Sequence, residues 1–236
     1  MNIADYLVQA KVGQAPVDYK WDARLRNRIL AADADTKPTL AKAIGAVSVR
    51  AAFAFAVAAS EWVVGRLSTK TDLSDALLRV QAGWAATLDA RYAILPLPED
   101  PDDDDDPLVA DPLYLAMMLL SQAHKYYLSS NIDRVYMGAL KLGMLAEHVA
   151  GRNPAFKKWI STVLKSAHKL YPKSTKPVDK QSPIVREVFE ADAAPPKEET
   201  SHANLLVTLD PSRNRYLVPA VDLQAAGIAK PYPQKG

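Results

Sequence analysis

Apolar side chains recur at every third or fourth position through most of the first 171 residues. An α-helix has about 3.6 residues per turn, so this spacing places the apolar side chains on one face of each helix. The sequence therefore predicts an all-α fold, an irregular bundle of five to six helices over residues 1–171. Five of the nine glycines fall within or at the ends of these patterns, which favours closely packed helices.

Capping residues and prolines mark where these helices start. An N-cap side chain followed by proline is typical of a helix N-terminus, and Asp111-Pro112 and Asn153-Pro154 both have this form. Gly151 stands in the usual place after a helix C-terminus. The expected helices run from Trp21 to Ala32, Pro38 to Leu67, Thr71 or Asp72 to Leu88, Asp111 to Leu128, Asn131 or Asp133 to Ala150, and Pro154 to Tyr171.

The most apolar stretch, residues 43–64, contains Arg50 and Glu61. A membrane-spanning helix needs about 20 largely uncharged apolar residues. The stretch between Arg50 and Glu61 is shorter than this. The two positions lie within about 20° of each other around a helix, on one narrow polar line. We therefore expect a mostly buried helix of a bundle and no membrane partner.

Charge is distributed unevenly along the chain, although the formal net charge is only +2. An acidic loop, residues 95–111, carries eight acids and no base, whereas residues 152–186 carry nine bases and one acid. Such separation indicates an anionic partner for the basic region, either a separate molecule or the chain's own acidic loop.

A lysine stripe runs along the last expected helix, because Lys165 and Lys169 each lie within about 20° of Lys158 around its axis. Lysines at such positions bind phosphates without reading a base sequence, and a solvated lysine face is the alternative interpretation. The stripe leads into what we expect to be a flexible basic arm. The candidate residues for binding nucleic acid or another anionic partner are Lys157, Lys158, Lys165, Lys169, Lys173, Lys176 and Lys180.

The chain changes character after Tyr171. Residues 172–200 are basic and rich in proline, which predicts a linker, and residues 201–236 form a C-terminal unit. Within it, the β-prone runs 205–209 and 215–218 flank Asp-Pro-Ser-Arg-Asn, which predicts a β-hairpin. An isolated hairpin is marginally stable, so we expect it to pack on the bundle, to join a partner, or to lack order.

Several kinds of chemistry lack their usual residues. The chain has no cysteine, which excludes disulfides and thiolate chemistry, and no two of its four histidines have the i, i+4 spacing of a helical metal site. Asp100, Asp102, Asp104 and Asp111 match ligand positions of a calcium-binding loop, but Asp105 stands where that loop needs glycine. We therefore predict no catalytic residue, no metal site and no cofactor.

These observations favour a non-enzymatic helical subunit of a larger bacterial or viral assembly that contacts protein partners through its C-terminal tail. The alternative is a protein that binds the nucleic-acid backbone through the lysine stripe and arm. The N-terminus lacks a basic segment followed by an apolar run, so we expect no signal peptide and a cytoplasmic location.

Overall fold

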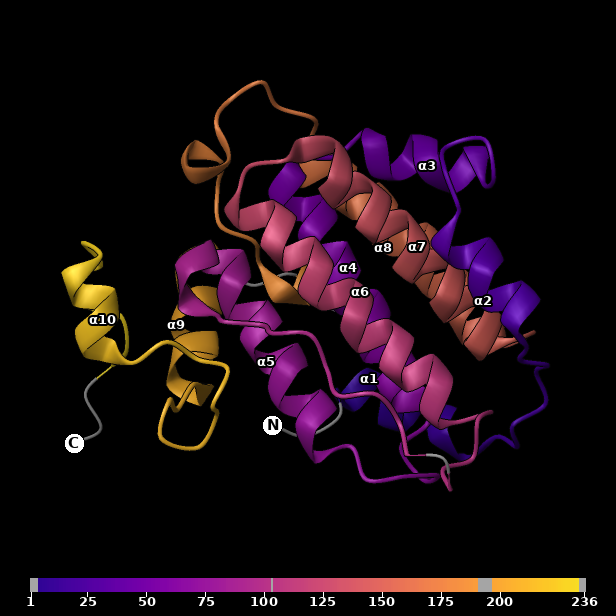
Figure 1. The fold of residues 1–236 in the computed structure, drawn as a ribbon. Coiled ribbons are helices and arrows are strands. Elements are labelled where there is room, and N and C mark those ends of the chain that lie inside the picture. The colour runs from indigo at the N-terminus through magenta and orange to yellow at the C-terminus, as the bar shows by residue number, and fades with distance from the viewer. Residues whose placement is uncertain (1–3, 103, 191–196, 234–236) are drawn as a thin grey trace.

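The structure, a computed structural model, describes residues 4–102, 104–190 and 197–233. Over these ranges the chain forms ten α-helices and four short 3-10 helices, and it contains isolated β-bridges but no sheet (Figure 1). The all-α fold class is confirmed. The predicted number of five to six helices is too low, partly because short helices such as α1 (Asp5–Gln9) and α2 (Ala23–Leu30) belong to the fold.

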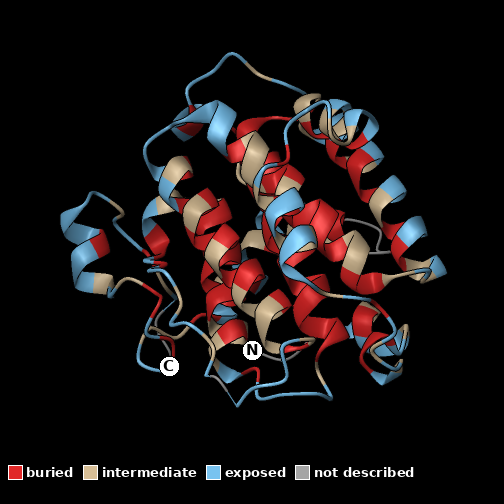
Figure 2. Ribbon diagram, turned by 45° about the vertical axis from the view of Figure 1, so that its right-hand side comes forward, coloured by how far each residue is buried: buried red, intermediate tan, exposed pale blue. Residues whose placement is uncertain are grey.

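Helix α4 (Val49–Arg66) is the centre of the molecule, and every one of its residues is buried. It packs against α5 (Ser74–Leu88), α6 (Ala110–Leu128) and most extensively α7 (Ile132–Ala150). Figure 2 shows this concentration of buried residues in the central helices, with exposed residues on the peripheral segments. The helix expected to be buried in a bundle is thus surrounded on all sides by the rest of the chain.

Helix α8 (Pro154–Leu170) covers a further side of α4 with an aromatic cluster. The ring of Trp159 lies 5.8 Å from that of Phe55 and 5.5 Å from that of Trp62, measured between ring centroids. Phe156 meets Trp62 edge to face at 5.0 Å. Aromatic pairs at these separations add favourable contact energy to the burial of apolar area.

The capping signals locate most of the long helices correctly. The side chain of Asn153 accepts hydrogen bonds from the backbone N–H groups of Ala155 (2.8 Å) and Phe156 (3.4 Å), with Pro154 as the first helical residue. Asn131 caps α7 in the same way. Helix α6 begins at Ala110, two residues before the predicted first helical residue, so Asp111 is not its N-cap. Pro112 still lies in the first turn, where its missing N–H costs no helical hydrogen bond.

The long helix predicted from Pro38 to Leu67 is wrong, because two helices occupy that range. Helix α3 (Pro38–Gly45) ends before an extended segment, and Ser48 then caps α4 by accepting a hydrogen bond from Ala51 N at 3.2 Å. Val47 in this break forms an antiparallel bridge with Pro172. Apolar periodicity continues across the break, so it could not reveal the break.

The β-hairpin predicted for residues 205–209 and 215–218 is also wrong. Residues Glu198–Thr208 form α9, and only Leu217 of the second run makes a bridge, with Ala93. A strand would bury Leu205, Val207 and Leu209 together, since alternate residues share a face. Instead Leu205 and Leu209, four residues apart, are buried, while Val207 is 65% exposed, as a helical period requires. A short helix, α10 (Ala220–Ala225), follows.

Residues 172–190, which we call the strap, pack back onto the bundle where a flexible arm was expected. The strap contains the 3-10 helices η3 (Val178–Lys180) and η4 (Arg186–Phe189) and buries five apolar side chains. The indole Nε1–H of Trp159 donates to the carbonyl oxygen of Phe189 at 2.8 Å. The buried strap residues are Val178, Ile184, Val185, Val188 and Phe189.

The three charged residues of α4 bind peripheral segments of the chain. Arg50 donates to the carbonyl oxygens of Leu88 (2.6 Å) and Val178 (3.0 Å), and Arg66 donates to that of Ala15 (2.7 Å). Glu61 pairs with Arg186 of the strap at 2.9 Å. Within the described ranges, no helix is both long and apolar enough to cross a membrane.

Candidate functional site

The lysines predicted as a binding surface are all exposed. Helix α8 buries Phe156, Trp159, Val163, Leu164 and Ala167 against the bundle, which leaves the opposite side of the helix to the charged residues. The exposed candidates are Lys157, Lys158, Lys165 and Lys169 on α8, and Lys173, Lys176 and Lys180 on the strap.

Arg186, the last basic residue of the region 152–186, does not belong to this surface. Its side chain is only 23% exposed, and its guanidinium pairs with Glu61 and lies over the ring of Trp84, 5.4 Å from the centroid. The lysines, by contrast, stand in solvent; the 3.6 Å pair of Lys180 with Asp179 joins two side chains that are each over 70% exposed. Such a pair contributes little stability, since water and salt screen it.

The acidic loop is exposed and internally hydrogen-bonded. The backbone N–H of Asp102 donates to the Asp105 carboxylate at 3.1 Å, and that of Leu108 donates to Asp106 at 2.9 Å. Asp103, counted among the loop's acids, lies outside the described residues. Figure 1 shows the loop at the opposite end of the bundle from the top of the strap, so it does not cover the strap lysines there.

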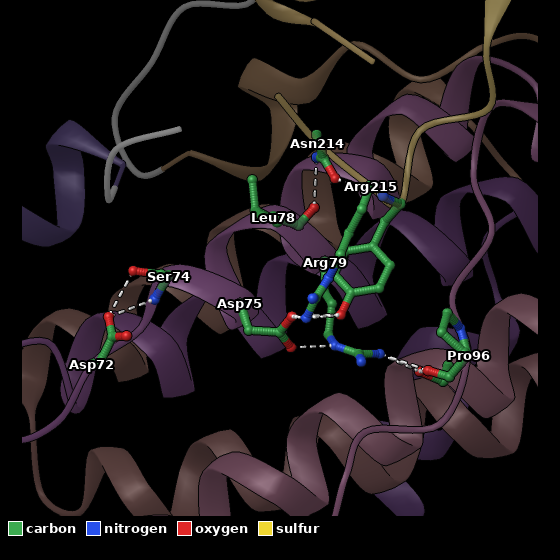
Figure 3. Close-up of polar contacts among 10 residues, drawn as sticks. Asp72, Ser74, Asp75, Leu78, Arg79, Pro96, Asn214 and Arg215 are labelled. Atoms are coloured by element: carbon green, nitrogen blue, oxygen red, sulfur yellow. Dashed lines mark hydrogen bonds and ion pairs between the residues drawn. The ribbon is translucent and has the colours of Figure 1, made fainter. Parts of the chain in front are cut away.

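A polar cluster that the sequence did not reveal fastens the C-terminal extension, residues 197–233, to α5 (Figure 3). We call it the Asp75 clamp, and it consists of Asp75, Arg79, Arg215 and Tyr216. Asp75 Oδ1 accepts hydrogen bonds from the Tyr216 hydroxyl and from Arg215 Nη2, and Oδ2 accepts one from Arg79 Nε at 2.6 Å. The guanidinium of Arg79 also stacks over the Tyr216 ring, 4.4 Å from its centroid.

The clamp changes the proton affinity of its members. Partial burial by itself raises the pKa of Asp75, but hydrogen bonds from Tyr216, Arg79 and Arg215 outweigh it and hold the pKa below the usual value. Burial, and the hydrogen bond to the Asp75 carboxylate, raise the pKa of Tyr216. With both carboxylate oxygens occupied by donors, Asp75 holds the chain together and is not placed to exchange protons with a substrate.

Two further contacts extend the attachment. Asn214, 1% exposed, donates from Nδ2 to the carbonyl oxygen of Leu78 and to Gln81 Oε1, both at 2.9 Å. Backbone bonds Ile94 N to Tyr216 O (2.9 Å) and Val218 N to Tyr92 O (3.0 Å) form the short bridge noted above. The extension is therefore held by side-chain and main-chain contacts together.

A cavity of about 770 Å³ lies beside the clamp. Its apolar wall includes Pro96, Leu97 and Met117, and its rim carries the acids Asp72, Glu99 and Asp105. Asp72 accepts two hydrogen bonds from Ser74 at the start of α5, so it serves the helix terminus. Over the described residues, no three histidine, aspartate or glutamate side chains come together in a way that could hold a metal ion.

His124 and His148 each form a hydrogen bond with a backbone carbonyl oxygen of another segment. His124 is buried on α6 with Nε2 3.0 Å from the carbonyl oxygen of Ala90, and burial lowers its pKa. His148 on α7 lies with Nε2 2.7 Å from the carbonyl oxygen of Lys20. Both side chains connect helices to a loop, which accounts for their positions without a chemical role.

An open groove of about 1060 Å³ crosses the C-terminal extension between α9 and α10. Leu206 and Val207 on α9 and Pro231 and Tyr232 beyond α10 line it. Val207 (65%) and Val221 (68%) are the two most exposed large apolar side chains in the described parts of the chain. The groove is thus bordered by apolar surface that the chain itself does not cover.

Comparison with models of protein families, with curated proteins and with solved structures finds no match to this chain.

The clamp makes a prediction about the extension. Replacing Asp75 by Asn removes the charge that three donors share, and we expect a loss of about 1 kcal/mol, reduced from the value for a buried charge because Asp75 is partly exposed. Limited proteolysis should cut residues 209–218 of Asp75→Asn faster than those of the wild type. The control is Asp133→Asn, an exposed acid in the first turn of α7.

The same prediction has a pH dependence. Because the folded-state pKa of Asp75 is depressed, its contribution is present above its unfolded pKa and is lost as the pH falls through the folded pKa. Acidification below about pH 4 should therefore loosen the wild-type extension more than that of Asp75→Asn. Equal cutting of all three proteins would remove the clamp's assigned role.

Proposed function

We propose that this protein is a non-enzymatic helical subunit of a larger assembly, bacterial or viral, and that it contacts a protein partner through its C-terminal extension. The observation that carries the proposal is the groove between α9 and α10, whose lining includes the 65% exposed side chain of Val207. Exposed apolar surface that is concave and rimmed by polar groups is typical of protein interaction sites.

The attachment of the extension supports this proposal. Asn214 and Tyr216 fix the chain between α9 and α10 on the bundle, and Tyr92 stacks edge to face on Tyr232 at 5.5 Å. The Tyr92 hydroxyl donates to the carbonyl oxygen of Pro231 at 2.7 Å. A surface held in place before binding loses less conformational entropy when a partner docks.

The buried charged groups of the bundle are engaged within the fold. The charged groups of α4 are engaged with main-chain carbonyls or with Arg186, and the Asp75 carboxylate accepts three hydrogen bonds from side chains. Groups occupied in this way hold the fold together. This favours a role carried by the surface over one carried by an interior active site.

The double variant Ala203→Asp, Val207→Asp places charge on two exposed residues that line the groove and should release the protein from its assembly. We expect the wild type in native extracts to elute well above its 25.8 kDa monomer mass in size-exclusion chromatography, and the variant to elute as a monomer. Both side chains are exposed, so the substitutions spare the core.

The matched control is Leu128→Asp, Ile132→Asp, which changes two exposed apolar residues at the α6–α7 turn. This variant should still elute well above the monomer mass, as the wild type does. The proposal fails if the wild type elutes as a monomer in native extracts, or if the control variant dissociates to the same extent as the groove variant.

The exposed lysines favour a second candidate function, binding of a nucleic-acid backbone. Lys158, Lys165 and Lys169 lie on the solvent side of α8, and Lys173 and Lys176 continue the positive surface onto the strap. Because Arg186 pairs with Glu61, the candidate surface consists of lysines. A lysine ammonium suits contacts with phosphate, but it lacks the forked guanidinium geometry with which arginine reads bases.

For this second function, the triple change of Lys158, Lys165 and Lys169 to Glu should abolish binding of labelled duplex DNA or single-stranded RNA in fluorescence anisotropy. Wild-type affinity should fall by about tenfold or more between about 50 and 200 mM salt. A control with the same net charge replaces Lys42, Lys70 and Lys230, exposed elsewhere, and should retain most of the binding. Equal weakening by both triples would show a general charge effect and no stripe.

A further inference from the structure

A second apolar groove lies between α3, α7 and α8, on the face of α8 next to the lysine surface. Its volume is about 430 Å³, which is within the range of small-molecule sites. Leu40 and Leu164, 6% and 7% exposed, form its base. Ala43, Ala46 and Ile160 complete the apolar lining.

The geometry of the groove follows from how α3 and α8 are joined. The two helices meet at their C-terminal ends, where Ser48 N donates to Tyr171 O at 2.9 Å and Lys173 N to Ala46 O at 2.8 Å. From this junction the groove follows α8 from His168 back to Ile160, a length of about 12 Å at the rise of an α-helix. The junction fixes the two walls relative to each other.

The groove is open because small residues face it from α3. Ala43 and Ala46 occupy positions where longer side chains would reach α8 and fill the space. Interiors of proteins are close-packed, so a persistent apolar hollow loses contacts that a ligand can restore. An elongated apolar group is the shape that this groove would accept.

The charged residues at the rim of the groove determine whether an anionic or a cationic head group would be favoured there. Lys37 and Glu147 form an ion pair at 2.7 Å at one edge, which balances their charges. Lys165 lies on the opposite wall with His168 one turn further along α8, and both are exposed. The rim therefore has a net positive charge, carried by Lys165.

We propose that this groove binds an amphipathic carboxylate with a linear alkyl chain, the chain lying on Leu40 and Leu164 and the carboxylate beside Lys165. The ligand's apolar body matches the lining, and its charge complements the rim. This inference does not depend on the protein's role as a subunit, since the groove lies away from α9 and α10 and is formed by other helices.

Isothermal titration calorimetry with three probes of equal chain length tests the proposal. Decanoate should bind with a sub-millimolar dissociation constant, and decanol should bind more weakly. The dissociation constant of decyltrimethylammonium should be at least about fivefold higher than that of decanoate. The order follows from the charge of Lys165 acting on a shared apolar contact. No detectable decanoate binding at millimolar concentration, or equal binding of the anion and the cation, would overturn it.

Three variants locate the site. Ala43→Trp fills the groove and should reduce decanoate binding at least about tenfold, while Lys165→Glu should reverse the preference between decanoate and decyltrimethylammonium. Lys157→Glu makes the same charge change on α8 outside the groove and should leave binding close to wild type.

Thermal unfolding checks that Ala43→Trp folds. If that variant does not fold, Ser161→Phe provides a second test, because it obstructs the groove from an exposed position on its rim. Decanoate binding that persists in the folded obstructed variant would place the ligand elsewhere and contradict the proposal.

Discussion

The buried ion pair between Glu61 and Arg186 is the interaction on which the outer parts of this structure depend. Glu61 is 2% exposed in the C-terminal half of the central helix, where burial raises its pKa and Arg186 acts in the opposite direction. A carboxylate in such a position is costly unless a counter-charge accompanies it into the interior. The strap supplies that charge, and Trp84 covers the guanidinium. The return of the chain over the bundle after α8 thus satisfies a requirement set by α4.

Buried charge organises the rest of the periphery in the same way. Arg66 binds the carbonyl oxygen of Ala15 in the N-terminal segment, and Arg50 binds those of Leu88 and Val178. Arg66 therefore holds the N-terminal segment, and Arg50 and Glu61 hold the strap, against a helix that is otherwise apolar. The Asp75 clamp repeats the principle one layer further out, on α5. The groove of the extension, the lysine surface of α8 and the groove between α3 and α8 remain open to solvent.

How much of this could be predicted follows from the range of the forces involved. Capping at Asn153 and Asn131 acts within a few residues, so the sequence located those helices well. The break at Ser48 depends on pairing with Tyr171 and Pro172, far along the chain, and periodicity carried no sign of it. Residues 205–209 form a short apolar run, which periodicity alone assigns poorly to helix or strand.

Arg186 was grouped with the lysines because charge counts do not distinguish buried from exposed groups. The i, i+4 spacing of Asp75 and Arg79 was the one available signal of the clamp.

The most direct test of the ion pair's role is a double-mutant cycle on Glu61 and Arg186, measured by urea unfolding at pH 7. Arg186→Met leaves the Glu61 carboxyl buried without its partner and should lower the free energy of unfolding by about 3 kcal/mol. Adding Glu61→Met removes the unpaired group, and the double variant should return to within about 1 kcal/mol of the wild type. A loss below about 1 kcal/mol in Arg186→Met, or a double variant no more stable than the single one, would contradict the account.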